Sequence, residues 1–88
     1  MSTTAAASVE SSMLRRGANA EKMFQLGMMY ASGRSVPADM VSAHKWFNIA
    51  ALRGNAEAAR LRREVAEEMS EGEIATAQRA ARDWITRH

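Results

Sequence analysis

The chain has 88 residues, a formal net charge of +2 and no cysteine, and 47% of its residues are hydrophobic. This length fits one small domain and excludes two separate hydrophobic cores, and the lack of cysteine excludes a disulfide scaffold, a zinc ribbon and a thiol nucleophile. The pI is about 9.7, but ten of the twelve basic residues are arginines, so the field at pH 7 is weak and the pI alone does not indicate a nucleic-acid or membrane partner.

The N-terminal residues 1–17 are rich in Ser, Thr and Ala, which predicts a flexible tail. They lack a basic start followed by an apolar core, so we expect a cytoplasmic protein without a cleaved leader. No apolar run in the sequence is long enough to cross a membrane. Within the tail, residues 9–16 align with the end of a later helix. We interpret them as the remnant of an earlier unit, able to fold back as a short helix on the first main helix.

The first main helix is predicted from Asn19 to Ser32, where apolar residues cover well over half of the helical wheel. A helix this apolar must be covered on more than one side. Gly27 lies on the apolar arc, although glycine in a helix interior costs about 1 kcal/mol relative to alanine. We therefore expect the second helix to approach closely at Gly27, near Ala43 or Phe47.

Gly33 and Pro37 interrupt the helical pattern and predict a turn, after which Asp39 has the character of an N-cap. The second helix is predicted for residues 40–53. It has apolar arcs on two opposite sides, and Val41, Ile49 and Leu52 form the second of them. A helix with two apolar sides in a short chain must form an interior layer, packed on the first helix on one side and on a later element on the other.

Asn55 is predicted to cap a third helix that runs to about Met69, apolar on one side and charged on the other. Arg62 falls inside its apolar arc. Small neighbours favour a side chain that extends its charged end to solvent, and the alternative is the anchor of a buried ion pair. Ser70 and Glu73 form an S-x-x-E capping box that starts a fourth helix. This helix is apolar on one side only, as expected of an element that closes a stack.

Two stretches of the sequence repeat. The residues around Asn19 recur around Asn55 at an offset of 36, and Trp46 recurs as Trp84 at an offset of 38. Two helices in such a period are typical of an α-helical solenoid, whose units bury their apolar faces against neighbours. Both tryptophans are therefore expected to be largely buried. The sequence predicts an all-α fold, a short α-α superhelix of two helix-turn-helix repeat units with four main helices, at residues 18–54 and 55–88.

The first unit carries a family signature. It consists of Ala20, Phe24, Leu26, Gly27, Met29, Tyr30, Gly33, Val36, Asp39, Ala43, Trp46, Phe47, Ala50, Ala51, Gly54 and Ala56. On these residues, segment 18–56 resembles the Sel-one-like repeat, a relative of the tetratricopeptide repeat. The second unit has Arg62 and Arg63 and no tyrosine where the family has L-G-x-x-Y, so it resembles a terminal, capping unit. The resemblance implies units stacked into a right-handed superhelix that serves as a protein-interaction scaffold without catalysis.

Residues suited to catalysis or metal binding are few. His44 has no Cys, His, Asp or Glu at helical metal-ligand spacing, and His88 is the terminal residue. Glu64 and Glu68 have the spacing of an acid–base pair, but no cleft is predicted around them, which favours a solvated charged face. The sequence has no phosphate loop, dinucleotide fingerprint or hydrolase motif. We therefore expect a protein that is not an enzyme and has no cofactor and no metal.

The sequence leaves two other kinds of partner open, a nucleic acid and a second copy of the chain. The arginine clusters would carry a small nucleic-acid-binding protein, and they comprise Arg15, Arg16, Arg60, Arg62, Arg63, Arg79, Arg82 and Arg87. Acidic residues interrupt these clusters and no aromatic residue lies among them to stack on bases, so nucleic acid is the less favoured alternative. A third hypothesis is self-association, in which copies stack through the uncapped N-terminal end.

A line of exposed side chains is predicted along the first helix, at spacings of 4, 3 and 4 residues from Glu21 to Ser32. The resemblance implies that this helix lines a binding groove. Flexible thioethers suit an adaptable peptide-binding surface, and Met28 is the preferred anchor because Met29 fills an apolar position of the repeat. We expect a non-catalytic interaction module or adaptor that binds a peptide or protein partner on this face. The predicted contact residues are Glu21, Lys22, Gln25, Met28, Met29 and Ser32.

Overall fold

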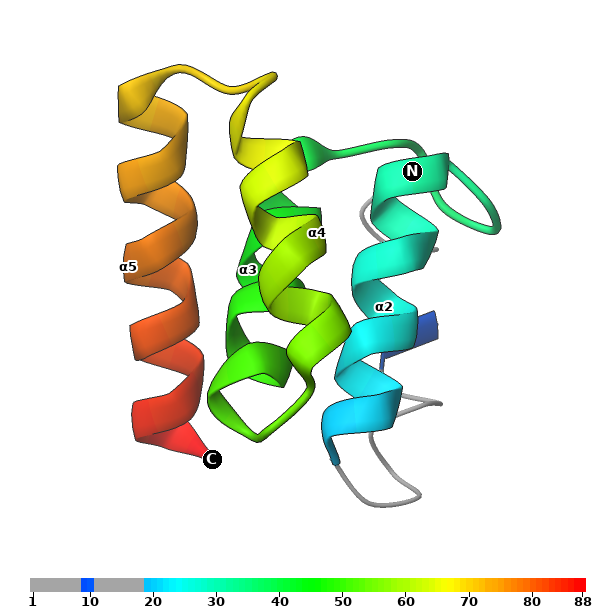
Figure 1. The fold of residues 1–88 in the computed structure, drawn as a ribbon, viewed down its shortest axis with the longest axis vertical. Coiled ribbons are helices and arrows are strands. Elements are labelled where there is room, and N and C mark those ends of the chain that lie inside the picture. Colours follow the sequence, from blue (N-terminus) through cyan, green and yellow to red (C-terminus); the bar gives the residue numbers. More distant parts are fainter. Residues whose placement is uncertain (1–8, 11–18) are drawn as a thin grey trace.

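The computed structural model describes residues 9–10 and 19–88. All regular secondary structure in these residues is helical, which confirms the predicted all-α class. The predicted tail at residues 1–17 lies outside the described part of the chain, apart from Val9 and Glu10, which are helical. The main helices are α2 (Ala20–Ser32), α3 (Met40–Leu52), α4 (Ala56–Ala66) and α5 (Glu71–Arg87) (Figure 1).

Polar side chains begin all four of these helices. Asn19, Asp39 and Asn55 each accept a hydrogen bond from the backbone N–H three residues further on, at 2.9, 3.2 and 2.9 Å. Ser70 and Glu73 form the reciprocal capping box, in which each side chain accepts from the other residue's N–H, at 3.1 and 2.8 Å. These bonds satisfy N–H groups that have no partner within a helix, and they confirm the caps predicted from the sequence.

The turn between α2 and α3 is fixed by backbone hydrogen bonds. Gly33 takes the left-handed conformation at φ 76°, and its N–H donates to the carbonyl of Met29 at 2.9 Å. The N–H of Asp39 donates to the carbonyl of Tyr30 at 3.0 Å. Between these points Val36 is 4% exposed, so the turn adds an apolar side chain to the core. The chain thereby reverses, and α3 runs antiparallel to α2.

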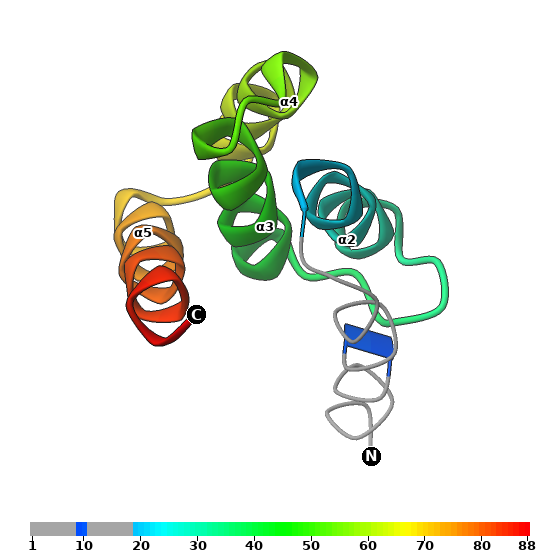
Figure 2. The ribbon, with the colours of Figure 1, turned by 90° about the horizontal axis from the view of Figure 1, so that it is seen from below.

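Helix α3 is the centre of the molecule and packs against α2, α4 and α5 (Figure 2). This arrangement confirms the predicted interior layer. Its buried side chains include Trp46, Phe47 and Ile49, each at most 1% exposed. Leu52, which the sequence places on the second apolar arc, is instead 66% exposed, because it is the last residue of α3, where the chain turns toward α4.

The second pair of helices, α4 and α5, does not pack together as a helical hairpin. Helices α4 and α5 each pack closely on α3 but scarcely contact each other (Figure 2). In a stack of helix-turn-helix units, the two helices of each unit pack on one another, as α2 and α3 do here. The described helices therefore form a compact bundle around α3, with extents of 30 × 29 × 22 Å. The two-unit superhelix stays a prediction.

Gly27 allows α2 and α3 to lie close together. A Cβ atom at this position would lie 2.5 Å from Cδ1 and Cε1 of Phe47, far inside van der Waals contact. The predicted close approach at Gly27 is confirmed, and the partner is Phe47. The ring of Phe47 also packs on that of Phe24, with centroids 5.9 Å apart.

The two equivalent tryptophans meet in the core. The rings of Trp46 and Trp84 pack edge to face with centroids 5.3 Å apart. Trp46 is fully buried, as predicted, whereas Trp84 is only partly buried. Trp84 lies near the end of α5, and its ring also stacks on the exposed His88 at 4.5 Å. The predicted burial is therefore complete for Trp46 and partial for Trp84.

Helix α4 ends three residues earlier than the sequence predicts, at Ala66. The N–H of Glu68 donates to the carbonyl of Val65 at 3.0 Å, and the N–H of Met69 donates to that of Ala66 at 3.1 Å. These bonds reach back three residues rather than four, so the chain tightens and leaves the helix axis. This tight turn brings the chain to Ser70 and the start of α5.

Candidate functional site

The predicted line of contact residues forms an exposed ridge on α2. Glu21, Gln25, Met28 and Ser32 are all exposed, and Met28 is 44% exposed despite its apolar side chain. The amide of Gln25 donates to the carboxylate of Glu21 at 3.4 Å. Met28 is therefore the apolar member of a ridge whose other three side chains are polar.

The two flanking residues are less accessible. Lys22 is partly buried, and its backbone N–H donates to the cap residue Asn19. Met29 is also partly buried and packs against the core. Its carbonyl accepts from the N–H groups of Gly33 and Arg34, at 2.9 and 3.2 Å. The backbone carbonyl of Met29 thus accepts the hydrogen bonds that end α2, while the side chain of Met28 is exposed.

A groove of about 260 Å³ lies at the C-terminal end of this ridge. Side chains from α2, α3 and α4 form its apolar walls, because the end of α2 and the second half of α4 both lie beside the start of α3. Of the six predicted contact residues, Met28 and Ser32 line the groove, and the other four lie outside it. The groove is lined by Met28, Ala31, Ser32, Met40, Phe47, Leu61, Glu64, Val65 and Glu68.

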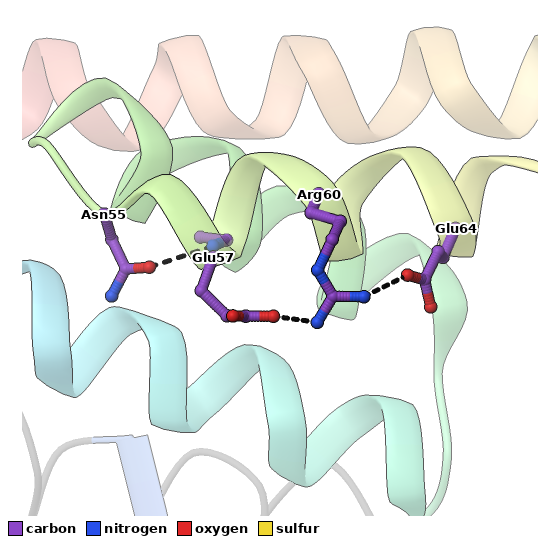
Figure 3. A network of polar contacts seen from close by, with 5 residues as sticks. Asn55, Glu57, Arg60 and Glu64 are labelled. Carbon is purple, nitrogen blue, oxygen red and sulfur yellow. Dashed lines mark hydrogen bonds and ion pairs between the residues drawn. The ribbon is translucent and has the colours of Figure 1, made fainter.

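The α4 side of the groove carries carboxylates. Glu64 accepts from the guanidinium of Arg60 at 2.5 Å, and Arg60 also pairs with Glu57. Figure 3 shows these three side chains extending from α4 toward the side where α2 lies. All three are half-exposed, so each ion pair contributes little to stability. Glu68 is exposed on the same rim, in the turn that follows α4.

From the sequence alone, the side chains that form the walls of the groove are expected in the core, and those that form its rim are expected on a solvated face. Leu61 and Val65 lie on the apolar arc of the third helix, and Glu64 and Glu68 were expected to be ordinary surface charges. The signal that could have found them is their spacing of three, one and three residues. Such a stripe marks the boundary between the apolar and charged faces of a helix, where a groove forms if a neighbouring helix stops short.

A buried polar group lies on another side of α3. His44 is 3% exposed, and its Nδ1 atom has no hydrogen-bond partner among residues 9–10 and 19–88. Burial lowers the pKa of His44, and the nearby charge of Arg62 lowers it further. The Nη1 atom of Arg62 donates to Oδ1 of Asn48 on α3 at 2.6 Å. This partner is a neutral amide, so the described residues give no support to the alternative of a buried ion pair, and Arg62 is only partly buried.

A second cluster of ionisable groups joins Glu10 to α2 and α3. The hydroxyl of Tyr30 donates to the carboxylate of Glu10, and burial together with this bond raises the pKa of Tyr30. Burial lowers the pKa of Lys45, while Glu10 and Asp39 raise it. Val9 packs against the core. Val9 and Glu10 belong to the predicted remnant helix at residues 9–16, and they contact the core and α2 respectively. Residues 11–16 lie outside the described part of the chain.

The arginines of the nucleic-acid alternative do not form one surface in the described part of the chain. Arg60 is held by carboxylates, and Arg62 is turned toward α3. Arg87 lies 3.5 Å from the carboxylate of Asp83. A shallow hollow on α5 is lined by Arg79, Ala80, Arg82, Asp83 and Thr86. Arg15 and Arg16 lie outside the described residues.

No protein-family model, curated protein or solved structure matches this chain in comparisons of all three kinds. In residues 9–10 and 19–88, no group of three or more His, Cys, Asp or Glu side chains is placed to hold a metal ion. Over the same residues, no helix is both long enough and apolar enough to span a membrane. The candidate site is the groove between α2 and α4, where apolar side chains from three helices meet.

Proposed function

We propose that the chain is a non-catalytic protein-interaction module, an adaptor of the cytoplasm, whose partner places an apolar side chain in the groove between α2 and α4. One observation carries the proposal. The groove is walled by apolar side chains from three helices, and Met28 stands 44% exposed at its mouth. A large apolar side chain that stays in water at the edge of an apolar groove is typical of a binding anchor.

The position of the ridge supports the same function. Glu21 and Gln25 lie on α2 in line with Met28, so a segment that enters the groove can continue along them. The likeness of residues 18–56 to the Sel-one-like repeat also supports an interaction module, since the family uses this helix to line its groove. The thioether of Met28 is flexible and polarizable, which suits contact with apolar side chains of different shapes.

The test uses peptides selected from a library. Phage that display random dodecapeptides are selected on the immobilised full chain, and the selected peptides are synthesised with a fluorophore. Fluorescence anisotropy then gives their affinity for the wild type and for Met28→Asp. We expect the Met28→Asp substitution to weaken binding at least tenfold, because a charge at the mouth of an apolar groove must be desolvated when the ligand binds.

A matched control comes from Leu52, which is also large, apolar and exposed but lies at the end of α3, outside the groove. Leu52→Asp should bind the same peptides with wild-type affinity, and thermal melts of both variants should show a folded protein. If no peptide is selected, or if Met28→Asp binds as well as the wild type, the proposed function is wrong.

A further inference from the structure

The side of α4 that borders α2 and the groove is rich in carboxylates. Glu57 and Glu64 lie on this side and both pair with Arg60, and Glu68 continues the rim in the turn after α4 (Figure 3). Arg62 is directed away from this side, because its guanidinium donates to Asn48 of α3. The groove rim is therefore acidic, although the whole chain has a formal net charge of +2.

None of the described residues that line the groove is basic. Its α2 wall consists of Met28, Ala31 and Ser32, which carry no charge, so nothing on that wall offsets Glu64 and Glu68. Glu64 is already engaged by Arg60 at 2.5 Å, whereas no ion pair is formed by Glu68 in the described part of the chain. A cation brought by a partner would meet Glu68 first and could share Glu64 with Arg60.

The size of the groove limits what enters it. A volume of about 260 Å³ is below the usual 300–1,000 Å³ of small-molecule sites and suits one large side chain. Its α4 wall extends from Leu61 to Val65, a rise of about 6 Å at 1.5 Å per residue, and Glu68 follows in the turn after α4. One apolar side chain and one neighbouring charged side chain fill a site of that length.

We infer that the partner is a basic peptide segment, in which a single large apolar side chain enters the groove and an adjacent Lys or Arg pairs with Glu68 and Glu64. This inference rests on the proposed function and adds the charge of the partner. Charge complementarity carries it, since an acidic peptide or a phosphate backbone would face Glu68, which forms no ion pair in the described residues, while Arg60 beside it is already paired with Glu57 and Glu64. Exposed pairs are screened by salt, so the affinity should fall as ionic strength rises.

The library selection described above tests the inference. We expect the selected dodecapeptides to share a large apolar residue with Lys or Arg close to it. Binding of the synthetic peptide should weaken at least threefold in Glu68→Lys, because an attraction is replaced by a repulsion. The matched control is Glu67→Lys, which makes the same change of charge one residue earlier, at an exposed position outside the groove. That variant should keep its affinity within about twofold.

A charge exchange completes the test. Replacing the basic residue of the peptide by Glu should weaken its binding to the wild type and restore its binding to Glu68→Lys. Peptides that need Met28 but have neutral or acidic neighbours, or equal losses in Glu67→Lys and Glu68→Lys, would overturn the basic partner and leave the proposed function standing. Peptides whose binding does not depend on Met28 would overturn both.

Discussion

At Gly27, α2 has no side chain to hold the ring of Phe47 away. Glycine is a poor residue in a helix, yet here it permits an aromatic ring to lie against the backbone. Phe47 is 1% exposed and also packs on Phe24, so its ring has little room to move aside. The packing of α2 on α3 therefore depends on the absence of a single methyl group.

Replacing Gly27 by alanine should lower the free energy of unfolding, even though alanine is the better helix former. Overpacking costs about 1–3 kcal/mol, which exceeds the helix gain of about 1 kcal/mol, and Gly27→Leu should cost more. Urea denaturation measures the change. The control is Gly72→Ala on α5, where the nearest side-chain atom is 3.9 Å away, and this variant should be unchanged or more stable. A gain in stability for Gly27→Ala would show that Phe47 moves freely.

His44 should make stability depend on pH. Its pKa in the folded protein is lowered, first by burial and then by Arg62, while the unfolded chain has a histidine of ordinary pKa near 6.5. Below about pH 6.5 the unfolded state therefore takes up the proton more readily than the folded state. Stability is fully present above this pH and falls on acidification, by at most about 1.4 kcal/mol per pH unit.

The measurement is a set of urea midpoints between pH 7.5 and 5.5 for the wild type and for His44→Leu. The variant should have a flatter profile over this range, because it keeps His88 and all carboxylates and lacks only the buried imidazole. Parallel profiles for the two proteins would mean that His44 titrates alike in the folded and unfolded states.

At the scale of helices, the starts, the interior place of α3 and its close approach to α2 at Gly27 were predictable, and the packing of α4 and α5 was not. Asn55 and Ser70 act on backbone groups within three residues, so local sequence is enough to locate the starts of α4 and α5. That α4 and α5 both pack on α3 rather than on each other depends on contacts across the whole chain. The groove has the same origin, since Met28, Met40 and Leu61 meet there from three helices. The sequence contains these residues but does not show that they lie close together in space.

The two tryptophans should differ in their contribution to stability. Trp46→Ala should cost about 3–5 kcal/mol, because the ring is fully buried between α3 and its neighbours. Trp84→Ala should cost clearly less, because its ring is only partly buried and one of its neighbours is the exposed His88. Urea denaturation of both variants checks the order. Equal losses would contradict this order and show that the ring of Trp84 contributes as much to stability as the ring of Trp46.

At the scale of the molecule, α3 has the role of a shared core. Three helices cover it, and α2 and α4 lie beside it so that a groove opens where α2 ends. The groove therefore depends on how both helices pack on α3, and a partner that binds it contacts both halves of the chain. Binding should then stabilise the fold by mass action, since the unfolded chain has no such site.

The most direct test of this account is a map of the binding surface by ¹⁵N NMR. The spectrum of the full-length protein is recorded while a selected dodecapeptide is added. If the peptide binds in the groove, the largest changes in amide chemical shift should occur at groove residues, namely Met28, Ser32, Leu61, Val65 and Glu68. Shifts confined to the arginine-bearing surface of α5 around Arg79 and Arg82, with the groove residues unmoved, would contradict it.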